Sequence, residues 1–93
     1  MEEPKHIQQA IEHTKILFGE ELGLVSEEDV LNWLKAKVRH MLEHDFNRLV
    51  NLLYRIDVYE EKARHCFGRQ NLEIADCLAK LIWERQLQKV RRS

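Results

Sequence analysis

Two histidines and a glutamate stand at a spacing that could bind zinc, in the run His40-Met41-Leu42-Glu43-His44. Histidines four residues apart project from the same side of a helix and could share one metal ion, with Glu43 as a general base. The run matches H-x-x-E-H, a pattern of zinc peptidases. Such an enzyme also needs a distant carboxylate ligand and a domain that encloses its substrate, which 93 residues do not provide. We therefore expect solvent-facing polar positions and no bound metal.

Cys66 and Cys77 lie eleven residues apart, without a C-x-x-C pair. Together with His65, and with His6 or His13 as a further ligand, they could form a soft metal site, but no zinc-site spacing connects them. The N-terminus carries no basic segment followed by an apolar one, so we expect no signal peptide and a location in the cytoplasm. Cysteines stay reduced in that compartment. The sequence therefore predicts two reduced, partly buried thiols.

Nucleophilic catalysis has no good candidate residue in this sequence. The two serines are Ser26, which is placed to begin a helix, and Ser93, which is the last residue. His65 and Cys66 are neighbours whose side chains diverge by about 100° on a helix, so they cannot form a catalytic pair. No glycine-rich phosphate loop is present. We expect a protein that is not an enzyme and has no cofactor.

The composition indicates a small globular protein. Apolar residues make up 44% of the chain and charged residues 33%, which suits one core with a solvated surface. Three Gly and one Pro are too few for the turns of a β-sandwich or barrel. The densest apolar stretch, 77–83, is interrupted by Lys80 and is far shorter than the roughly 20 residues of a membrane span. We therefore expect a single domain, 1–93, with no membrane segment.

The N-terminal half predicts two amphipathic helices. Pro4 suits the first turn of a helix, where its missing N–H has no role, and Gly19 can end that helix. Ser26 precedes three acidic residues, which predicts an N-cap followed by carboxylates at the positive end of the helix dipole. The two apolar stripes comprise Ile7, Ala10, Ile11, Thr14, Leu17 and Phe18, and then Val30, Leu31, Leu34, Val38, Met41 and Leu42.

The segment 27–57 contains no Gly or Pro, so one long helix or two shorter ones fit it. In a single helix Asp45 would stand in the middle of the apolar stripe, where an unpaired carboxylate is costly. As an N-cap, Asp45 would instead open a new helix, and we favour a break near His44–Asp45. The apolar stripe of that new helix comprises Phe46, Leu49, Leu53 and Ile56.

Capping signals also place the last two helices. Asp57 with Glu60 three residues later matches a capping box, which predicts the start of a short helix. Gly68 is placed to end that helix in a left-handed conformation. Asn71 then caps a helix over about 72–91. Because no strand, repeat or low-complexity segment is evident, the sequence predicts an all-α compact bundle of four or five helices.

The last helix is apolar on two roughly opposite faces. A surface helix has one apolar stripe, so two faces predict burial on both sides. Either the helix runs through the bundle centre, or one face covers a second copy or another protein. We favour a protein-interaction or self-association module, and a homodimer in particular, because tryptophan is enriched in interface cores. The candidate interface residues are Trp83, Leu87, Val90 and Leu72.

Charge is distributed unevenly along the chain. Residues 1–46 carry five Lys/Arg against ten Asp/Glu, and residues 47–93 carry ten against six. Cations at the end of the last helix could contact phosphate, so the alternative function is a small nucleic-acid-binding accessory protein. Its candidate phosphate-contacting residues are Arg85, Lys89, Arg91 and Arg92. The same cations could equally stabilise the helix dipole or pair with acidic side chains.

The predicted corner between two helices offers one further polar site, built from Arg55, Tyr59 and Glu60. The run Tyr54-Arg55-Ile56-Asp57-Val58 at this corner is followed by Ile74-Ala75, Leu81-Ile82, Glu84-Arg85-Gln86 and Lys89 on the last helix. In these motifs the segment 45–89 resembles a family of small bacterial helical proteins of unknown function. The resemblance implies a small cytosolic helical protein and implies no activity, cofactor or site.

Overall fold

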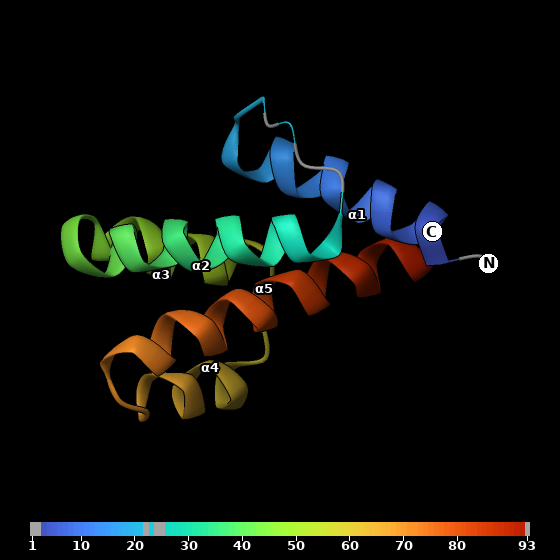
Figure 1. Cartoon of the computed structure of the whole chain (residues 1–93). Helices are drawn as coiled ribbons and strands as arrows, with labels where there is room; N and C mark the ends of the chain where they lie inside the picture. The colour runs from blue at the N-terminus through green and yellow to red at the C-terminus, as the bar shows by residue number, and fades with distance from the viewer. Residues whose placement is uncertain (1–2, 22, 24–25, 93) are drawn as a thin grey trace.

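A computed structural model describes residues 3–21, 23 and 26–92 of the chain. The described residues form five α-helices, which confirms the predicted all-α bundle: α1 (Glu3–Phe18), α2 (Glu27–His44), α3 (Phe46–Arg55), α4 (Glu60–Phe67) and α5 (Asn71–Arg92). The helices pack into one body with a radius of gyration of 12.7 Å (Figure 1). Among the described residues, no helix combines the length and the apolar character that crossing a bilayer requires.

The α5 helix is the central element of the bundle. It packs against α1, α2 and α4, and its C-terminal half runs beside the start of α1 (Figure 1). Burial on several sides explains the two apolar faces of this helix. Leu78 and Ile82 on one face are 0% exposed, and Trp83 on the other is 3% exposed. The α5 helix therefore runs through the centre of the bundle, which is one of the two arrangements that its sequence predicted.

The first two helices pack with their predicted stripes inward. Ala10, Ile11 and Phe18 of α1 are buried, and the ring of Phe18 meets Trp33 of α2 edge to face at 4.9 Å. The buried Thr14 hydroxyl donates to the Ala10 carbonyl oxygen at 2.8 Å, so its polar atom is satisfied inside the core. The predicted end of α1 and the predicted start of α2 are both confirmed in the structure. Gly19 has a φ of +66° after α1, and Ser26 caps α2 by accepting from the Asp29 N–H.

Asp45 separates α2 from α3, as its position in the stripe predicted. Its backbone N–H donates to the Met41 carbonyl oxygen at 2.9 Å and so closes the last turn of α2. Its carboxylate accepts from the Arg48 N–H at 3.3 Å and caps the first turn of α3. One residue thus ends one helix and begins the next, and its side chain stays exposed to water.

The corner after α3 differs from the predicted capping box. Asp57 has a φ of +61°, and α4 begins at Glu60 after an N-cap at Tyr59 that makes no side-chain cap bond. The N–H groups of Asp57 and Val58 donate to the Tyr54 and Leu53 carbonyl oxygens, at 3.1 and 3.2 Å. These two bonds form a Schellman motif with Asp57 in the left-handed position after the helix. Asp57 therefore ends α3 and does not open α4, and the prediction of an N-cap there was wrong.

Two smaller predictions for the chain around α4 are also corrected. Gly68 has a φ of −81°, so α4 ends without the left-handed residue that glycine was expected to supply. Asn71 is the first residue of α5, and the carbonyl oxygen of Gln70 accepts the first N–H bonds of that helix. The turn between α4 and α5 is therefore only three residues long, from Gly68 to Gln70.

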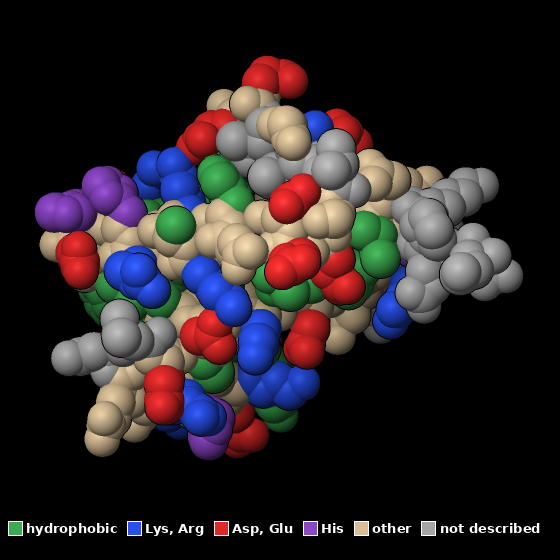
Figure 2. Space-filling model, viewed as in Figure 1, with side chains coloured by type: hydrophobic (Ala, Val, Ile, Leu, Met, Phe, Trp, Pro, Cys, Tyr) green, Lys and Arg blue, Asp and Glu red, His purple; other side chains and the backbone are tan. Residues whose placement is uncertain are grey.

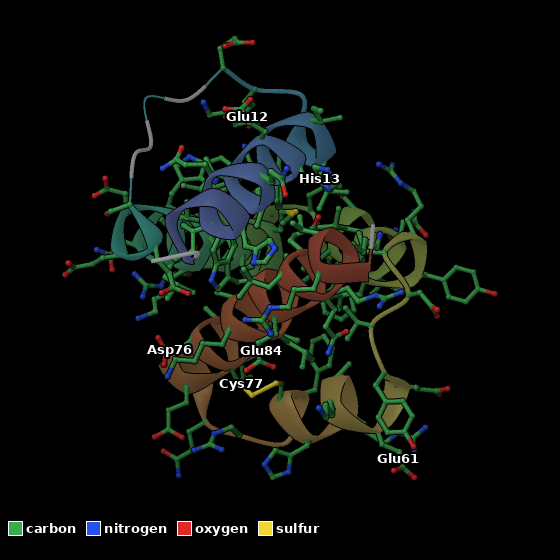
Figure 3. All side chains as sticks on the ribbon, turned by 90° about the vertical axis from the view of Figure 1, so that its right-hand side faces the viewer. Glu12, His13, Glu61, Asp76, Cys77 and Glu84 are labelled. Carbon is green, nitrogen blue, oxygen red and sulfur yellow. A yellow bond between two sulfur atoms is a disulfide. The ribbon has the colours of Figure 1, made fainter. Side chains whose placement is uncertain are left out.

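Cys66 and Cys77 form a disulfide bond that joins α4 to α5 (Figure 3). The prediction of two reduced thiols was wrong. The sequence separation of eleven gave no hint of pairing, because the sharp turn between α4 and α5 is what brings the two Cα atoms to 5.4 Å. The reduced thiols had been inferred from the expected cytoplasmic location, a compartment in which disulfides are rare.

Candidate functional site

A groove with a volume of about 730 Å³ lies between α3 and α4 and is closed beneath by α5. Val50, Leu53 and Tyr54 line its α3 side. Ala63 and Phe67 are apolar residues of its α4 side. Because α3 and α4 each pack on other helices and make few contacts with each other, their facing sides leave an open apolar channel. Below, this feature is called the α3–α4 groove.

The α3 side of the groove comes from an apolar face that the core does not use. At about 100° per residue, positions 46, 50 and 54 fall on one side of α3, next to the arc that holds Leu49 and Leu53 in the core. Phe46, Val50 and Tyr54 are 49%, 43% and 89% exposed. Phe46 was expected in the buried stripe, and its exposure corrects that expectation. A surface helix normally keeps only its core arc apolar, so this second, exposed apolar arc needs an explanation of its own.

Phe46 and Phe67 connect α3 to α4 at one end of the groove. Their rings meet edge to face with centroids 5.8 Å apart, a favoured arrangement for aromatic pairs. At the other end, Tyr59 at the start of α4 is 64% exposed and lines the groove. Aromatic side chains therefore border both ends of the channel. Such residues carry much of the binding energy at protein interfaces.

Arg85 holds the corner beneath the groove in place. Its Nε–H donates to the Ile56 carbonyl oxygen at 2.8 Å, which satisfies a backbone group at the end of α3. Its Nη2 lies 3.8 Å from the Asp57 carboxylate, and its Nη1 donates to Gln88 at 3.3 Å. The Arg85 side chain is only 21% exposed. This guanidinium is therefore engaged in bracing the α3 corner of the fold.

The charges that line the groove are of both signs. Asp57, Glu60 and Glu84 contribute carboxylates, and Lys62 and Arg85 contribute cations. Asp57 faces Arg85, as described above, and Glu60 accepts from Arg64 at 2.9 Å, one turn along α4. Lys62 and Glu84 make no ion pair with any described residue. They are left as two opposite charges on the α4 and α5 sides of the same groove.

The predicted interface residues do not form a surface. Trp83 and Val90 are 3% and 6% exposed within a single chain, so they are core residues, and their prediction as interface anchors is corrected. Leu87 is partly buried and packs against the same core. The side chain of Leu72 lies outside the described residues. Trp83 is buried because α5 is covered on both sides, which its sequence pattern alone did not distinguish from an interface.

The predicted phosphate-contacting residues are only partly available. Arg85 is engaged at the α3 corner. Lys89 is half-buried and has an interaction of its own, whereas Arg91 is exposed. The side chain of Arg92 lies outside the described residues. On the face drawn in Figure 2, basic and acidic side chains lie next to one another and do not form a field of one sign.

The predicted polar site at the corner is divided by the fold. Tyr59 and Glu60 line the α3–α4 groove. Arg55 instead lines a separate hollow of about 360 Å³ beside the end of α1, together with Arg48 and Asn51. The three residues Arg55, Tyr59 and Glu60 therefore do not meet in one site.

The histidine pair of α2 lies at the surface. His40 and His44 are exposed, with ring centroids 4.7 Å apart, and the His44 Nε2 lies 3.7 Å from the neighbouring Glu43 carboxylate. Among the described residues, no group of three or more His, Cys, Asp or Glu side chains could hold a metal ion. A catalytic zinc site would need a further ligand at this position, which the described chain does not provide.

An ion-pair cluster joins α2 to α5 away from the groove. The Lys35 Nζ lies 2.8 Å from the Asp76 carboxylate, and the Lys80 Nζ lies 3.5 Å from it. The hydrogen bond from Lys35 outweighs burial and lowers the pKa of Asp76 below its ordinary value. This cluster positions α5 against α2 and takes no part in the groove.

No protein-family model matches the chain, and neither the curated proteins nor the solved structures include a match. The resemblance of its corner and last helix to a bacterial helical family stays a prediction. The functional argument therefore rests on the groove and on the exposed residues that border it.

Proposed function

We propose that this chain is a noncatalytic self-association module that docks its α3–α4 groove against the same groove of a second copy. One observation carries the proposal. Among the described residues there are five exposed large apolar side chains, and four of them lie at or beside the groove: Phe46, Val50, Tyr54 and Tyr59. The fifth, Ile16, stands alone on α1. Apolar side chains gathered on one face mark an interaction surface, whereas scattered ones do not.

The shape of this face favours a second copy as the occupant. Tyr54 is 89% exposed and projects from the rim of a groove that is itself apolar. In a two-fold dimer the same patch serves both subunits, so a residue that enters the partner's groove is matched by its equivalent entering the first. The described surface has no second apolar ridge that could fill the groove in a head-to-tail arrangement.

The charges at the groove also suit a two-fold arrangement. Lys62 and Glu84 are opposite in sign and unpaired within the described chain. Two-fold symmetry would let Lys62 of each copy approach Glu84 of the other, so that each dimer gains two ion pairs at once. Rim pairs of this kind contribute more to register and association rate than to affinity.

The proposal is tested by the mass of the protein in solution. Light scattering on a sizing column, over a wide concentration range, should give twice the 11.2 kDa of one chain. Tyr54→Asp should weaken the dimer about 30-fold, because removing an aromatic residue that enters the partner's groove typically costs about 2 kcal/mol. The matched control is Ile16→Asp, which places the same charge at an exposed apolar residue outside the groove and should leave the dimer intact.

Three results would overturn the proposal. A mass of one chain at every concentration would exclude a second copy as the occupant. A dimer that both variants weaken equally, or that neither weakens, would place its interface elsewhere. Circular dichroism of both variants confirms that they fold, and at exposed positions we expect each to keep the helical signal of the parent protein.

The nucleic-acid alternative gains little support from the described side chains, because Arg85 is engaged at the corner, Lys89 has an interaction of its own, and only Arg91 of the three described candidates is exposed. The cytoplasmic location predicted from the sequence remains a proposal. Disulfides in the cytoplasm are rare and are mostly transient, catalytic or redox-sensing. A Cys66–Cys77 bond in a cytoplasmic protein would therefore be one that forms and breaks during the protein's life.

A further inference from the structure

We infer that the Cys66–Cys77 disulfide is a redox-sensitive restraint that keeps α4 docked as one side of the groove, and that its reduction weakens self-association. This inference rests on the proposed function, because it concerns the regulation of the same site. The disulfide connects α4 to the central helix α5, and Figure 3 shows the sulfur–sulfur bond between the two. The α3 side of the groove has no such restraint and is held by core packing instead.

The α4 helix has few other reasons to stay in place. It is eight residues long, and helices shorter than about 12 residues are marginal without tertiary contacts. Its N-cap, Tyr59, makes no side-chain cap bond. Among the residues of α4, Cys66 is the buried one, while Ala63 and Phe67 are half-buried. The most deeply buried contact of α4 is therefore the disulfide-bonded cysteine itself.

The α4 helix is indispensable to the groove. Lys62, Ala63 and Phe67 line it directly, and Glu60 and Tyr59 line its entrance from the start of the helix. If α4 leaves its docked position, the channel loses one side and can no longer enclose a side chain of the partner copy. A groove that is formed only part of the time binds more weakly, because the intrinsic dissociation constant is divided by the competent fraction once for each of the two copies.

The chemistry of release is thiol–disulfide exchange with a dithiol reductant. Cys77 is half-buried and Cys66 is 2% exposed, so a reductant reaches the disulfide more easily from the Cys77 side. A thiolate of the reductant attacks the Cys77 Sγ, which breaks the protein disulfide, forms a mixed disulfide and releases the Cys66 thiolate. The second thiol of the reductant then displaces Cys77 and becomes oxidised to the cyclic disulfide. Two electrons and two protons pass from the reductant to the two cysteines.

The experiment compares the oxidised protein with the protein treated with dithiothreitol. A thiol assay first verifies no free thiols in one sample and two in the other. Hydrogen exchange then follows the amides of α4, with those of α2 as an internal reference. Sedimentation equilibrium measures the dimer dissociation constant of both samples. A double variant, Cys66→Ala with Cys77→Ala, mimics the reduced state and controls for effects of the reductant on other groups.

On reduction we expect the α4 amides to lose protection while the α2 amides keep theirs. A docked fraction of about one tenth would weaken the dimer about a hundredfold, because both copies must present a formed groove. The double variant should match the reduced protein and should not respond to dithiothreitol. Unchanged α4 protection and an unchanged dissociation constant would overturn the inference. Loss of protection throughout the chain would overturn it as well, because the bond would then support the whole fold.

The same data separate this inference from the proposed function. A protein that is a monomer in both redox states, yet loses α4 protection on reduction, would overturn self-association but support the disulfide as the restraint on α4. A dimer whose dissociation constant is the same in both states, despite a released α4, would support self-association and overturn its redox control.

Discussion

The indole Nε1 of Trp83 donates a 2.6 Å hydrogen bond to the carboxylate of Glu27, 56 residues earlier in the chain. This bond joins the middle of α5 to the first residue of α2. It lets a large amphipathic side chain be buried while its one polar atom reaches a partner at the edge of the core. The ring is 3% exposed, so Trp83 packs inside a single copy of the chain.

Trp83→Asp should abolish folding. The substitution would remove a large buried ring and place a carboxylate in the core, and each of these mechanisms alone costs about 3 kcal/mol or more. Small domains have only about 5–15 kcal/mol to lose. Circular dichroism and thermal unfolding give the readout, with Tyr54→Asp as the control that places the same side chain at an exposed aromatic residue. A folded, monomeric Trp83→Asp protein would return Trp83 to the role of interface anchor.

Asp57→Gly should stabilise the corner between α3 and α4. Asp57 is the non-glycine residue with a positive φ in the described chain, and glycine adopts that conformation without the strain of a Cβ. The gain in unfolding free energy should be about 0.5–1 kcal/mol. Asp57→Val should be destabilising, because a β-branched residue is an outlier in this region. Urea unfolding provides the measurement.

The carboxylate of Asp57 also lies 3.8 Å from Arg85, so a substitution changes both this ionic contact and the strain of the backbone. A second variant is needed to distinguish the two effects. Asp57→Asn removes the charge and keeps a residue type that tolerates the left-handed region. Its stability should stay within about 0.5 kcal/mol of the parent, because the contact is exposed and weak. If Asp57→Asn were as destabilising as Asp57→Val, the Arg85 contact and not the φ angle would govern the corner.

Gln86→Leu should stabilise the core of the bundle. Gln86 is 3% exposed, and its Nε2 has no hydrogen-bond partner among the described residues. A buried unsatisfied donor costs about 1–3 kcal/mol, and leucine of similar size removes that cost. The midpoint of urea unfolding should rise accordingly. Gln9→Leu on the exposed face of α1 is the matched control and should change stability by less than about 0.5 kcal/mol. A clear loss of stability in Gln86→Leu would mean that the amide is satisfied.

Local signals in the sequence predicted most of the helix boundaries. Gly19, Ser26 and Asp45 act where their types indicated, because capping and turn formation depend on groups within about four residues. The wrong prediction of an N-cap at Asp57 also has a local cause. Aspartate suits both an N-cap and the left-handed residue after a helix, and the Leu53 and Tyr54 carbonyls selected the second role.

The sequence contains a pattern that corresponds to the groove, but part of this pattern was assigned to the buried side of α3. Phe46, Val50 and Tyr54 recur every four residues, which is an apolar stripe of its own. Phe46 was assigned to the core stripe because apolar periodicity does not say what a face packs against. That depends on which neighbouring helix covers it, and α4 meets this face of α3 at Phe67 while Val50 and Tyr54 stay exposed.

Composition and periodicity by themselves determined the all-α class, the helix order and most core positions, because the helical repeat is a property of neighbouring residues. The tertiary structure decided which other residues these residues contact. It buried Trp83 under α2 and turned Arg85 to the end of α3. It also brought Cys66 to Cys77 and left the Tyr54 face open. These outcomes depend on how helices pack across long sequence separations, and helical periodicity carries no information on that packing.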